Sequence, residues 1–142
     1  MNGRLWKEGA RLGSLHHVEM NVSDLARSAA LWGWLLGELG WAPYQEWDRG
    51  RSWKLGGTYL VFVQTAARHL TAPYHRGRVG LNHVALFAAS RAQVDELTAA
   101  VRARGLPILY EDRHPFAGGP NHYALFFEDP DRIKVEIVAP EG

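Results

Sequence analysis

The composition of this 142-residue chain favours one small globular domain with an ordinary hydrophobic core. Its 16 Lys and Arg nearly balance its 15 Asp and Glu, so a formal net charge of +1 gives no reason to expect nucleic acid or an anionic membrane as a partner. The chain has no cysteine, which excludes disulfides, thiolate metal sites and cysteine nucleophiles.

No apolar run of the sequence resembles a targeting or membrane-spanning segment. The N-terminal residues MNGRLWKEGARLGSLHH lack the apolar stretch of a secretory signal. Apolar runs elsewhere are much shorter than the roughly 20 residues that span a bilayer. We therefore expect a soluble, cytoplasmic protein.

A first module is predicted over residues 15–64. Residues 15–22, LHHVEMNV, have the composition of a strand and lead into the helix N-cap pair Ser23-Asp24. Apolar residues then recur at steps of three or four until Gly40, which indicates an amphipathic helix. Three short strands are expected to follow, over 41–47, 51–55 and 58–64.

The same order of elements is predicted again over residues 80–140. A strand over 80–88 precedes a helix that begins after Ser90 and stops at Gly105, and three strands follow at about 108–112, 121–128 and 132–138. The dipeptide His-Val occurs at 17–18 and at 83–84, a shift of 83 − 17 = 66 residues. The sequence thus predicts one α+β domain, residues 1–142, made of two βαβββ modules joined by a linker over 65–79.

Side-chain alternation along the strands predicts which residues face away from the helices. His17 and Glu19 share one face of the first strand, and His83 occupies the corresponding face of the repeated strand. Glu136 interrupts the apolar strand IKVEIV between Val135 and Ile137, so its carboxylate requires a partner. We expect these polar groups to face a central cavity enclosed by a cupped, mixed sheet.

Two imidazoles and one carboxylate form the ligand set of a facial metal site. Such a set suits Fe, Mn, Zn or Ni and leaves positions open for water and substrate. The alternative is that each histidine is an ordinary hydrogen-bonded strand residue and that Glu136 pairs with a nearby cation such as Lys134. The repeated placement of His17 and His83 favours the metal site.

Three segments of the chain resemble the vicinal oxygen chelate superfamily, which includes glyoxalase I, bleomycin-resistance proteins, fosfomycin-modifying thiol transferases and extradiol dioxygenases. The resemblance covers residues 15–140, and the segments that carry it are LHHVEMNVSDLARSAALWGWLLGELGW, GLNHVALFAASRAQVDELTAAVRARG and FFEDPDRIKVEIVAP. It implies paired modules around a divalent metal, and often a homodimer.

The resemblance assigns metal-ligand positions to His17, His83 and Glu136, with Glu136 also the catalytic residue. A fourth family position lies in the strand YLVFVQ, which has no carboxylate and would offer Gln64 or Phe62 on one face. This departs from the four-ligand site of glyoxalase I. The remaining candidates are side chains expected to contact substrate, namely Glu19, Trp47, Trp53, Phe62, His122 and Tyr123.

The resulting functional hypothesis is a metal-dependent enzyme acting on a small molecule that is chelated through two adjacent oxygens, as in a glyoxalase-like lyase or isomerase. One alternative is an extradiol-type dioxygenase, and a thiol or epoxide transferase is a further variant. Another alternative, from a different class, is a metal-free protein that sequesters a drug as bleomycin-resistance proteins do. The sequence does not separate these reactions.

Overall fold

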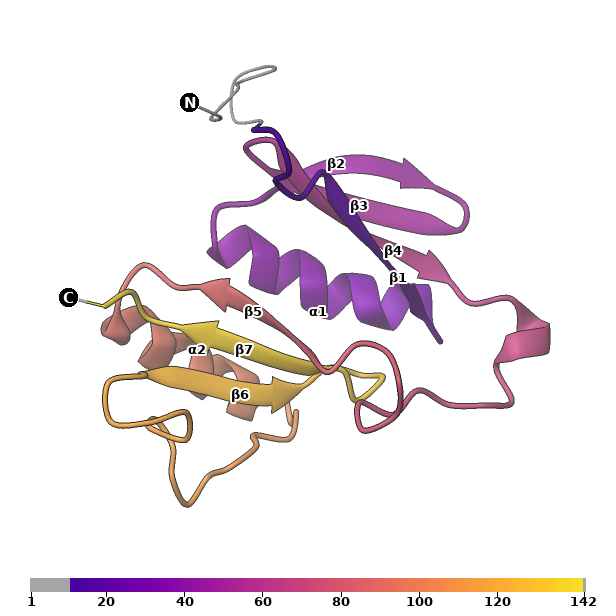
Figure 1. The fold of residues 1–142 in the computed structure, drawn as a ribbon. Helices are drawn as coiled ribbons and strands as arrows, with labels where there is room; N and C mark the ends of the chain where they lie inside the picture. Colours follow the sequence, from indigo (N-terminus) through magenta and orange to yellow (C-terminus); the bar gives the residue numbers. More distant parts are fainter. Residues whose placement is uncertain (1–10, 142) are drawn as a thin grey trace. The chain divides into compact units, whose positions relative to one another are not determined.

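The computed structural model describes residues 11–141 as two compact units, the first ending at Ala72 and the second beginning at Pro73. The division falls within the predicted linker over 65–79. Each unit contains one α-helix and one small mixed sheet (Figure 1), so the predicted α+β class is confirmed. None of the helices within residues 11–141 is long and apolar enough to span a membrane.

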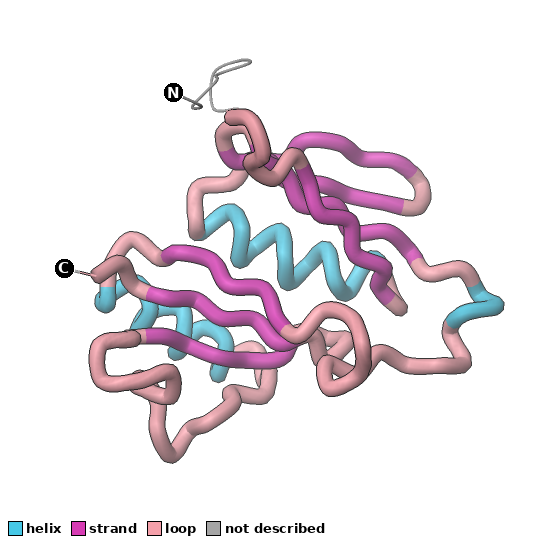
Figure 2. Tube along the Cα trace, viewed as in Figure 1, coloured by secondary structure: helices cyan, strands magenta, loops and turns pink. Residues whose placement is uncertain are grey.

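The first unit contains a four-stranded sheet with the order β1-β4-β3-β2. Strands β1 and β4 are parallel, and the other neighbours are antiparallel. A short 3₁₀ helix, η1, follows the sheet (Figure 2). The elements are β1 (His17–Val22), α1 (Leu25–Glu38), β2 (Ala42–Trp47), β3 (Gly50–Leu55), β4 (Thr58–Gln64) and η1 (Ala67–His69).

Helix α1 begins and ends where local chemistry favours a boundary. The Asp24 side chain accepts a hydrogen bond from the backbone N–H of Arg27 at 3.2 Å, as expected of an N-cap. Gly40, just beyond the helix, has φ +89°, a conformation that glycine adopts without steric cost. The apolar face between these limits packs on the sheet, where the ring of Trp32 lies 4.9 Å from that of Phe62.

The second unit contains a three-stranded sheet with the order β5-β7-β6, in which β7 is central. Strand β7 is parallel to β5 and antiparallel to β6. Ser90 caps the helix by accepting from Gln93 N at 3.1 Å, and Gly105 beyond its end has φ +74°. The elements are β5 (His83–Phe87), α2 (Arg91–Ala103), β6 (Ala124–Glu128) and β7 (Lys134–Val138).

The strand predicted at about 108–112 does not form as a full strand. Only Ile108 makes a β-bridge, to Phe127, and Leu109 N donates to Phe126 O at 2.8 Å. Tyr110 then adopts φ +57°, and the backbone N–H groups of Arg113 and His114 both bond to its carbonyl. The chain leaves the sheet because a left-handed residue cannot continue an extended strand.

Alternation along β7 and β6 separates a buried face from a face that carries polar groups. Val135, Ile137 and Phe127 are fully buried on the side of the sheet that packs on α2. The opposite face, which we call the open face, presents Glu136 and its register partner Phe126. The strand period therefore decides which side chains reach the candidate site.

Replacing Phe62 tests the core of the first unit. Its side chain is 0% exposed, so Phe62→Ala should lower the free energy of unfolding by about 3–5 kcal/mol in a denaturant titration. Phe87→Ala is the matched control, since Phe87 is 75% exposed and its loss should change stability by no more than about 0.5 kcal/mol. Equal losses in the two variants would contradict this assignment of the core.

Candidate functional site

A buried carboxylate lies at the centre of the second unit. Glu136 belongs to the central strand β7, between Ala85 of β5 and Phe126 of β6, and its side chain is only 8% exposed. Removing a carboxylate from water is costly unless hydrogen bonds or positive charge compensate it. The residues around Glu136 must therefore supply hydrogen bonds or positive charge to its carboxylate.

His83, at the start of β5, supplies the first partner. Its Nε2 lies 3.2 Å from Glu136 Oε1, and its Nδ1–H donates to Asn82 Oδ1 at 2.7 Å. Because the Asn82 oxygen accepts only, Nδ1 carries the hydrogen and a neutral His83 presents the Nε2 lone pair to the carboxylate. Two lone pairs that face each other repel, so a proton or a metal cation between them stabilises this arrangement.

His122 supplies the second partner from the loop that precedes β6. Its Nε2 contacts Glu136 Oε2, and its ring stacks on Phe126 with centroids 6.4 Å apart. Gly118 allows this position, because a Cβ atom there would lie 2.4 Å from His122 Cδ2. Each oxygen of Glu136 is thus engaged by a different imidazole.

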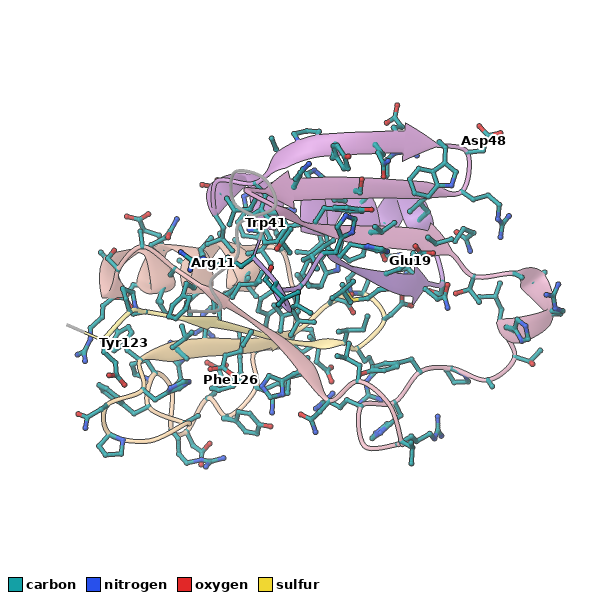
Figure 3. The ribbon with its side chains drawn as sticks, turned by 45° about the horizontal axis from the view of Figure 1, so that its top comes forward. Arg11, Glu19, Trp41, Asp48, Tyr123 and Phe126 are labelled. Atoms are coloured by element: carbon teal, nitrogen blue, oxygen red, sulfur yellow. The ribbon has the colours of Figure 1, made fainter. Side chains whose placement is uncertain are left out.

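These three side chains border an open pocket of about 430 Å³ that lies within the second unit. The pocket combines the carboxylate and imidazoles with aromatic rings and two cations. Phe126, labelled in Figure 3, is one of its aromatic residues, on β6. The lining residues are His83, Tyr110, Arg113, Ala117, Gly118, His122, Phe126, Lys134 and Glu136.

In the first unit, His17 lies on the corresponding face of β1. It is in register with Tyr59 of β4, and the two rings stack with centroids 4.8 Å apart. The Nδ1 atoms of His17 and His16 are 2.8 Å apart, so one ring donates to the other. Glu19, two residues further along β1, is exposed and in register with Val61.

Gln64 and Phe62 do not lie on the face that carries His17, contrary to the expectation from sequence. Gln64 Oε1 accepts from Leu25 N at 2.9 Å and its Nε2 donates to Ser23 O at 2.8 Å, so this side chain holds the start of α1. Phe62 is fully buried beside the helix. The face of β4 that lies beside His17 and Glu19 instead carries Tyr59 and Val61.

The position that corresponds to Glu136 in the first unit follows from the strand register. Glu136 is opposite Ala85, which is two residues after His83, whereas Val61 is opposite Glu19, which is two residues after His17. Val61 therefore occupies the place of the second-unit carboxylate. The first unit thus has valine at this position of β4, and its carboxylate, Glu19, lies on the neighbouring strand β1.

The two tryptophans expected to contact substrate have different surroundings. Trp53 is buried edge-on against Phe62, at 5.8 Å between ring centroids, and a Cβ atom on Gly33 would lie 3.0 Å from its ring. Trp53 is thus a core residue on the helix side of β3. Trp47 is exposed and covers Gly50, where a Cβ atom would lie 2.2 Å from its ring.

Tyr123 lies beside α2 and does not border the pocket of Glu136. Its hydroxyl donates to Asp95 Oδ1 at 2.5 Å, and the Arg91 guanidinium lies 4.8 Å from its ring centroid. The hydrogen bond to Asp95 is the main cause that raises the pKa of Tyr123 above its ordinary value, with a further contribution from burial. Tyr123 is therefore a protonated hydrogen-bond donor at neutral pH.

The residues present fit part of a metal site. Across residues 11–141, no three histidine, aspartate or glutamate side chains are arranged as a complete metal centre. His83 and Glu136 nevertheless converge, with the histidine oriented by Asn82 as metal-binding imidazoles usually are by a second hydrogen bond. The third predicted ligand, His17, belongs to the first unit.

Sequence reasoning did not assign a binding role to several residues that border the pocket. Lys134 could have been found, because it alternates with Glu136 along β7 and therefore shares its face. Tyr110 and Arg113 gave no such signal, and neither did Asn82, which bonds to His83 without bordering the pocket; all three lie outside the strands of the structure. Their positions depend on how the loops fold back on the sheet.

Comparison with known proteins agrees with this geometry. The sequence pattern of the glyoxalase/bleomycin resistance protein/dioxygenase superfamily matches residues 14–137, and the chain belongs to this superfamily. The uncharacterized protein YqjT of Bacillus subtilis (strain 168) is 57% identical over 126 residues, which cover 89% of this chain and 98% of YqjT. The resemblance to the vicinal oxygen chelate superfamily is thereby confirmed.

Solved structures show the same fold. A crystal structure of a candidate glyoxalase from Bacillus halodurans is 68% identical, with a TM-score of 0.89, covering 90% of this chain and 96% of that one. Lactoylglutathione lyase from Agrobacterium tumefaciens is 21% identical, with a TM-score of 0.63 and coverages of 91% and 95%. The fosfomycin resistance protein FosX from Listeria monocytogenes is 22% identical, with a TM-score of 0.63 and coverages of 90% and 91%.

Gln64→Ala tests whether this side chain is a helix cap or a ligand. We expect the variant to lose about 1–2 kcal/mol of unfolding free energy, because Leu25 N and Ser23 O lose their partner. The metal content of the same samples should equal that of the wild type. Gln64→Glu keeps an acceptor for Leu25 N and should recover part of the stability. If Gln64→Ala instead lost metal while its stability stayed unchanged, Gln64 would be a metal ligand.

Proposed function

We propose that this protein is a divalent-metal-dependent enzyme that binds a small substrate through two adjacent oxygen atoms, as a glyoxalase-like lyase or isomerase does. The observation that carries the proposal is the orientation of His83. Its Nδ1–H is held by Asn82, and its Nε2 faces the buried carboxylate of Glu136. A neutral imidazole and a carboxylate converge in this way when they share a cation.

The proposed ligands are His83 and Glu136 from the second unit and His17 from β1 of the first. Imidazole and carboxylate ligands suit Fe, Mn, Zn or Ni. When bound, such a metal would act as a Lewis acid toward the oxygens of the substrate. The absence of a carboxylate at Val61 leaves fewer protein ligands than a four-ligand site has.

The proton chemistry is assigned to Glu136 and His122. Oε1 of Glu136 faces His83, and Oε2 contacts His122. Oε2 can therefore exchange a proton with the His122 imidazole. A proton taken from a substrate at Oε2 can pass to His122 Nε2 and return by the same path. The ring of Phe126 lies beside that of His122, with centroids 6.4 Å apart.

A second candidate is an extradiol-type dioxygenase, and His122 is the observation that favours it. This reaction requires ferrous iron and an acid-base histidine close to it. His122 contacts Glu136 from the same pocket and is half-buried. The two reactions differ in the metal and in the substrate, so one set of measurements separates them.

Removal of His83 tests the proposed metal site. Purified wild-type protein should contain a stoichiometric divalent metal by elemental analysis, and His83→Ala should lose it together with activity. The matched control is His69→Ala, a histidine of η1 that does not border the pocket and should keep the metal. Full metal occupancy in His83→Ala would contradict the assignment.

The metal and the substrate tested then decide between the reactions. Zinc, nickel or manganese, with turnover of the thiohemiacetal of methylglyoxal and glutathione, supports the glyoxalase-like reaction. Iron, with oxygen consumption on catechols, supports the dioxygenase. A protein that stays metal-free under every loading condition and binds a drug-sized ligand would instead belong to the sequestering type.

Asn82→Leu tests the orientation of His83 without removing a ligand. Loss of a second hydrogen bond to a metal-binding histidine typically weakens metal affinity about 10- to 100-fold. We expect that loss in a chelator competition titration, with the unfolding free energy nearly unchanged because Asn82 is exposed. Asn82→Asp restores an acceptor for Nδ1–H and should recover affinity, which a purely structural role of Asn82 would not predict.

We also propose a cytoplasmic homodimer, as the resemblance to the superfamily implies. The edge strand β2 is exposed along its length and carries Tyr44 and Trp47, both more than one-third exposed. Light scattering coupled to gel filtration measures the mass in solution. A mass of 15.9 kDa, that of one chain, would contradict the dimer.

A further inference from the structure

We propose that Lys134, Arg113 and Tyr110 form an oxyanion-binding subsite beside Glu136, so that the substrate carries a carboxylate, phosphonate or phosphate group in addition to its two chelating oxygens. This inference rests on the proposed function for the chelating oxygens only. The subsite itself is argued from the second unit alone. All three residues border the pocket of about 430 Å³.

The ammonium group of Lys134 lies on the same strand face as the Glu136 carboxylate but forms no ion pair with it. Lys134 lies two residues before Glu136 on the same face of β7, but both oxygens of Glu136 are engaged by histidines. Its register partner Glu128 pairs with Arg76 and Arg132 instead. Within residues 11–141, Lys134 therefore has no carboxylate as an ion-pair partner.

Arg113 adds a second cation at the same end of the pocket. Its guanidinium lies 5.2 Å from the centroid of the Tyr110 ring, and the Lys134 ammonium lies 4.9 Å from the same centroid. Arg113 also forms no ion pair with a carboxylate in the part of the chain that the structure describes, residues 11–141. The two cations repel each other, and an anion bound between them would offset that repulsion.

Tyr110 completes the subsite with a hydrogen-bond donor. Lys134 Nζ donates to the Tyr110 hydroxyl oxygen at 2.9 Å, so the phenol hydrogen is directed to another acceptor. The position is also strained, since Tyr110 has φ +57°, a conformation that is uncommon for a residue with a side chain. Strained residues of this kind gather at binding sites, where the surrounding structure holds them.

The charges of the pocket define the class of ligand. Lys134 and Arg113 contribute two positive charges, and their ammonium and guanidinium groups are donors only. The Tyr110 hydroxyl oxygen accepts from Lys134, which leaves its O–H as a further donor. Glu136, the pocket's carboxylate, already contacts His83 and His122. An oxyanion accepts hydrogen bonds from all three groups, whereas a cationic or purely apolar ligand leaves the two cations unpaired.

Two hydroxamate probes separate the subsite from the metal. Acetohydroxamate chelates a metal through two adjacent oxygens, and phosphonoacetohydroxamate adds a phosphonate to the same chelating group. Affinities for metal-loaded protein are measured by isothermal titration calorimetry. We expect the phosphonate probe to bind wild-type protein about 100-fold more tightly, an advantage that Lys134→Gln and Arg113→Gln should each reduce about tenfold.

Lys54→Gln is the matched control for the loss of positive charge. Lys54 also lies over a tyrosine ring, 4.5 Å from the centroid of Tyr44, but it belongs to the first unit and does not border the pocket. This variant should keep the full advantage of the phosphonate probe. Affinity for acetohydroxamate should be the same in all four proteins.

Methylphosphonate and acetate test the subsite on metal-free protein, by NMR titration. Weak binding that Lys134→Gln abolishes supports the subsite even if the protein holds no metal, and the stronger of the two ligands identifies the kind of oxyanion. Equal affinity of the two hydroxamates in wild-type protein, with chelation still dependent on His83, would overturn the subsite and leave the proposed function intact. Binding of methylphosphonate that is unchanged in Lys134→Gln and Arg113→Gln would also overturn it.

Discussion

The carboxylate of Glu136 is the group on which the rest of the second unit depends. It sits on the central strand, and its neighbours Val135 and Ile137 point into the core, so the strand cannot rotate to expose it. The buried charge is compensated by His83 at the start of β5 and by His122 in the loop before β6. One carboxylate thereby joins the sheet to the loop that borders the pocket.

Much of the arrangement was predictable because strand alternation and helix caps are local properties of sequence. The faces of His83 and Glu136 and the caps Asp24 and Ser90 all followed from patterns a few residues long. Gln64 was misjudged because a polar residue at a strand end can face either substrate or a neighbouring helix. Only the register between β1 and β4, which joins residues about 40 positions apart, decides between these environments.

The two modules share a backbone plan but distribute their charges differently. In the second unit the carboxylate stands on β7 with alanine opposite it, and in the first unit it stands on β1 as Glu19 with Val61 opposite it. The residue in register with the strand histidine also differs between the modules. It is Tyr59 opposite His17 and a lysine opposite His83. The two modules therefore share the histidines but differ in the groups around them. This is expected if the second unit alone binds an anionic group of the substrate.

This divergence bears on the oxyanion subsite proposed above. Proteins of one fold catalyse different reactions because function depends on the groups placed at the site. Metal-binding residues position the reacting oxygens of a substrate but do not distinguish one chelating molecule from another. Discrimination must come from groups outside the repeated pattern. Lys134, Arg113 and the strained Tyr110 are such groups, because the register position of Lys134 holds tyrosine in the first unit and the other two residues lie in a loop that replaces a predicted strand.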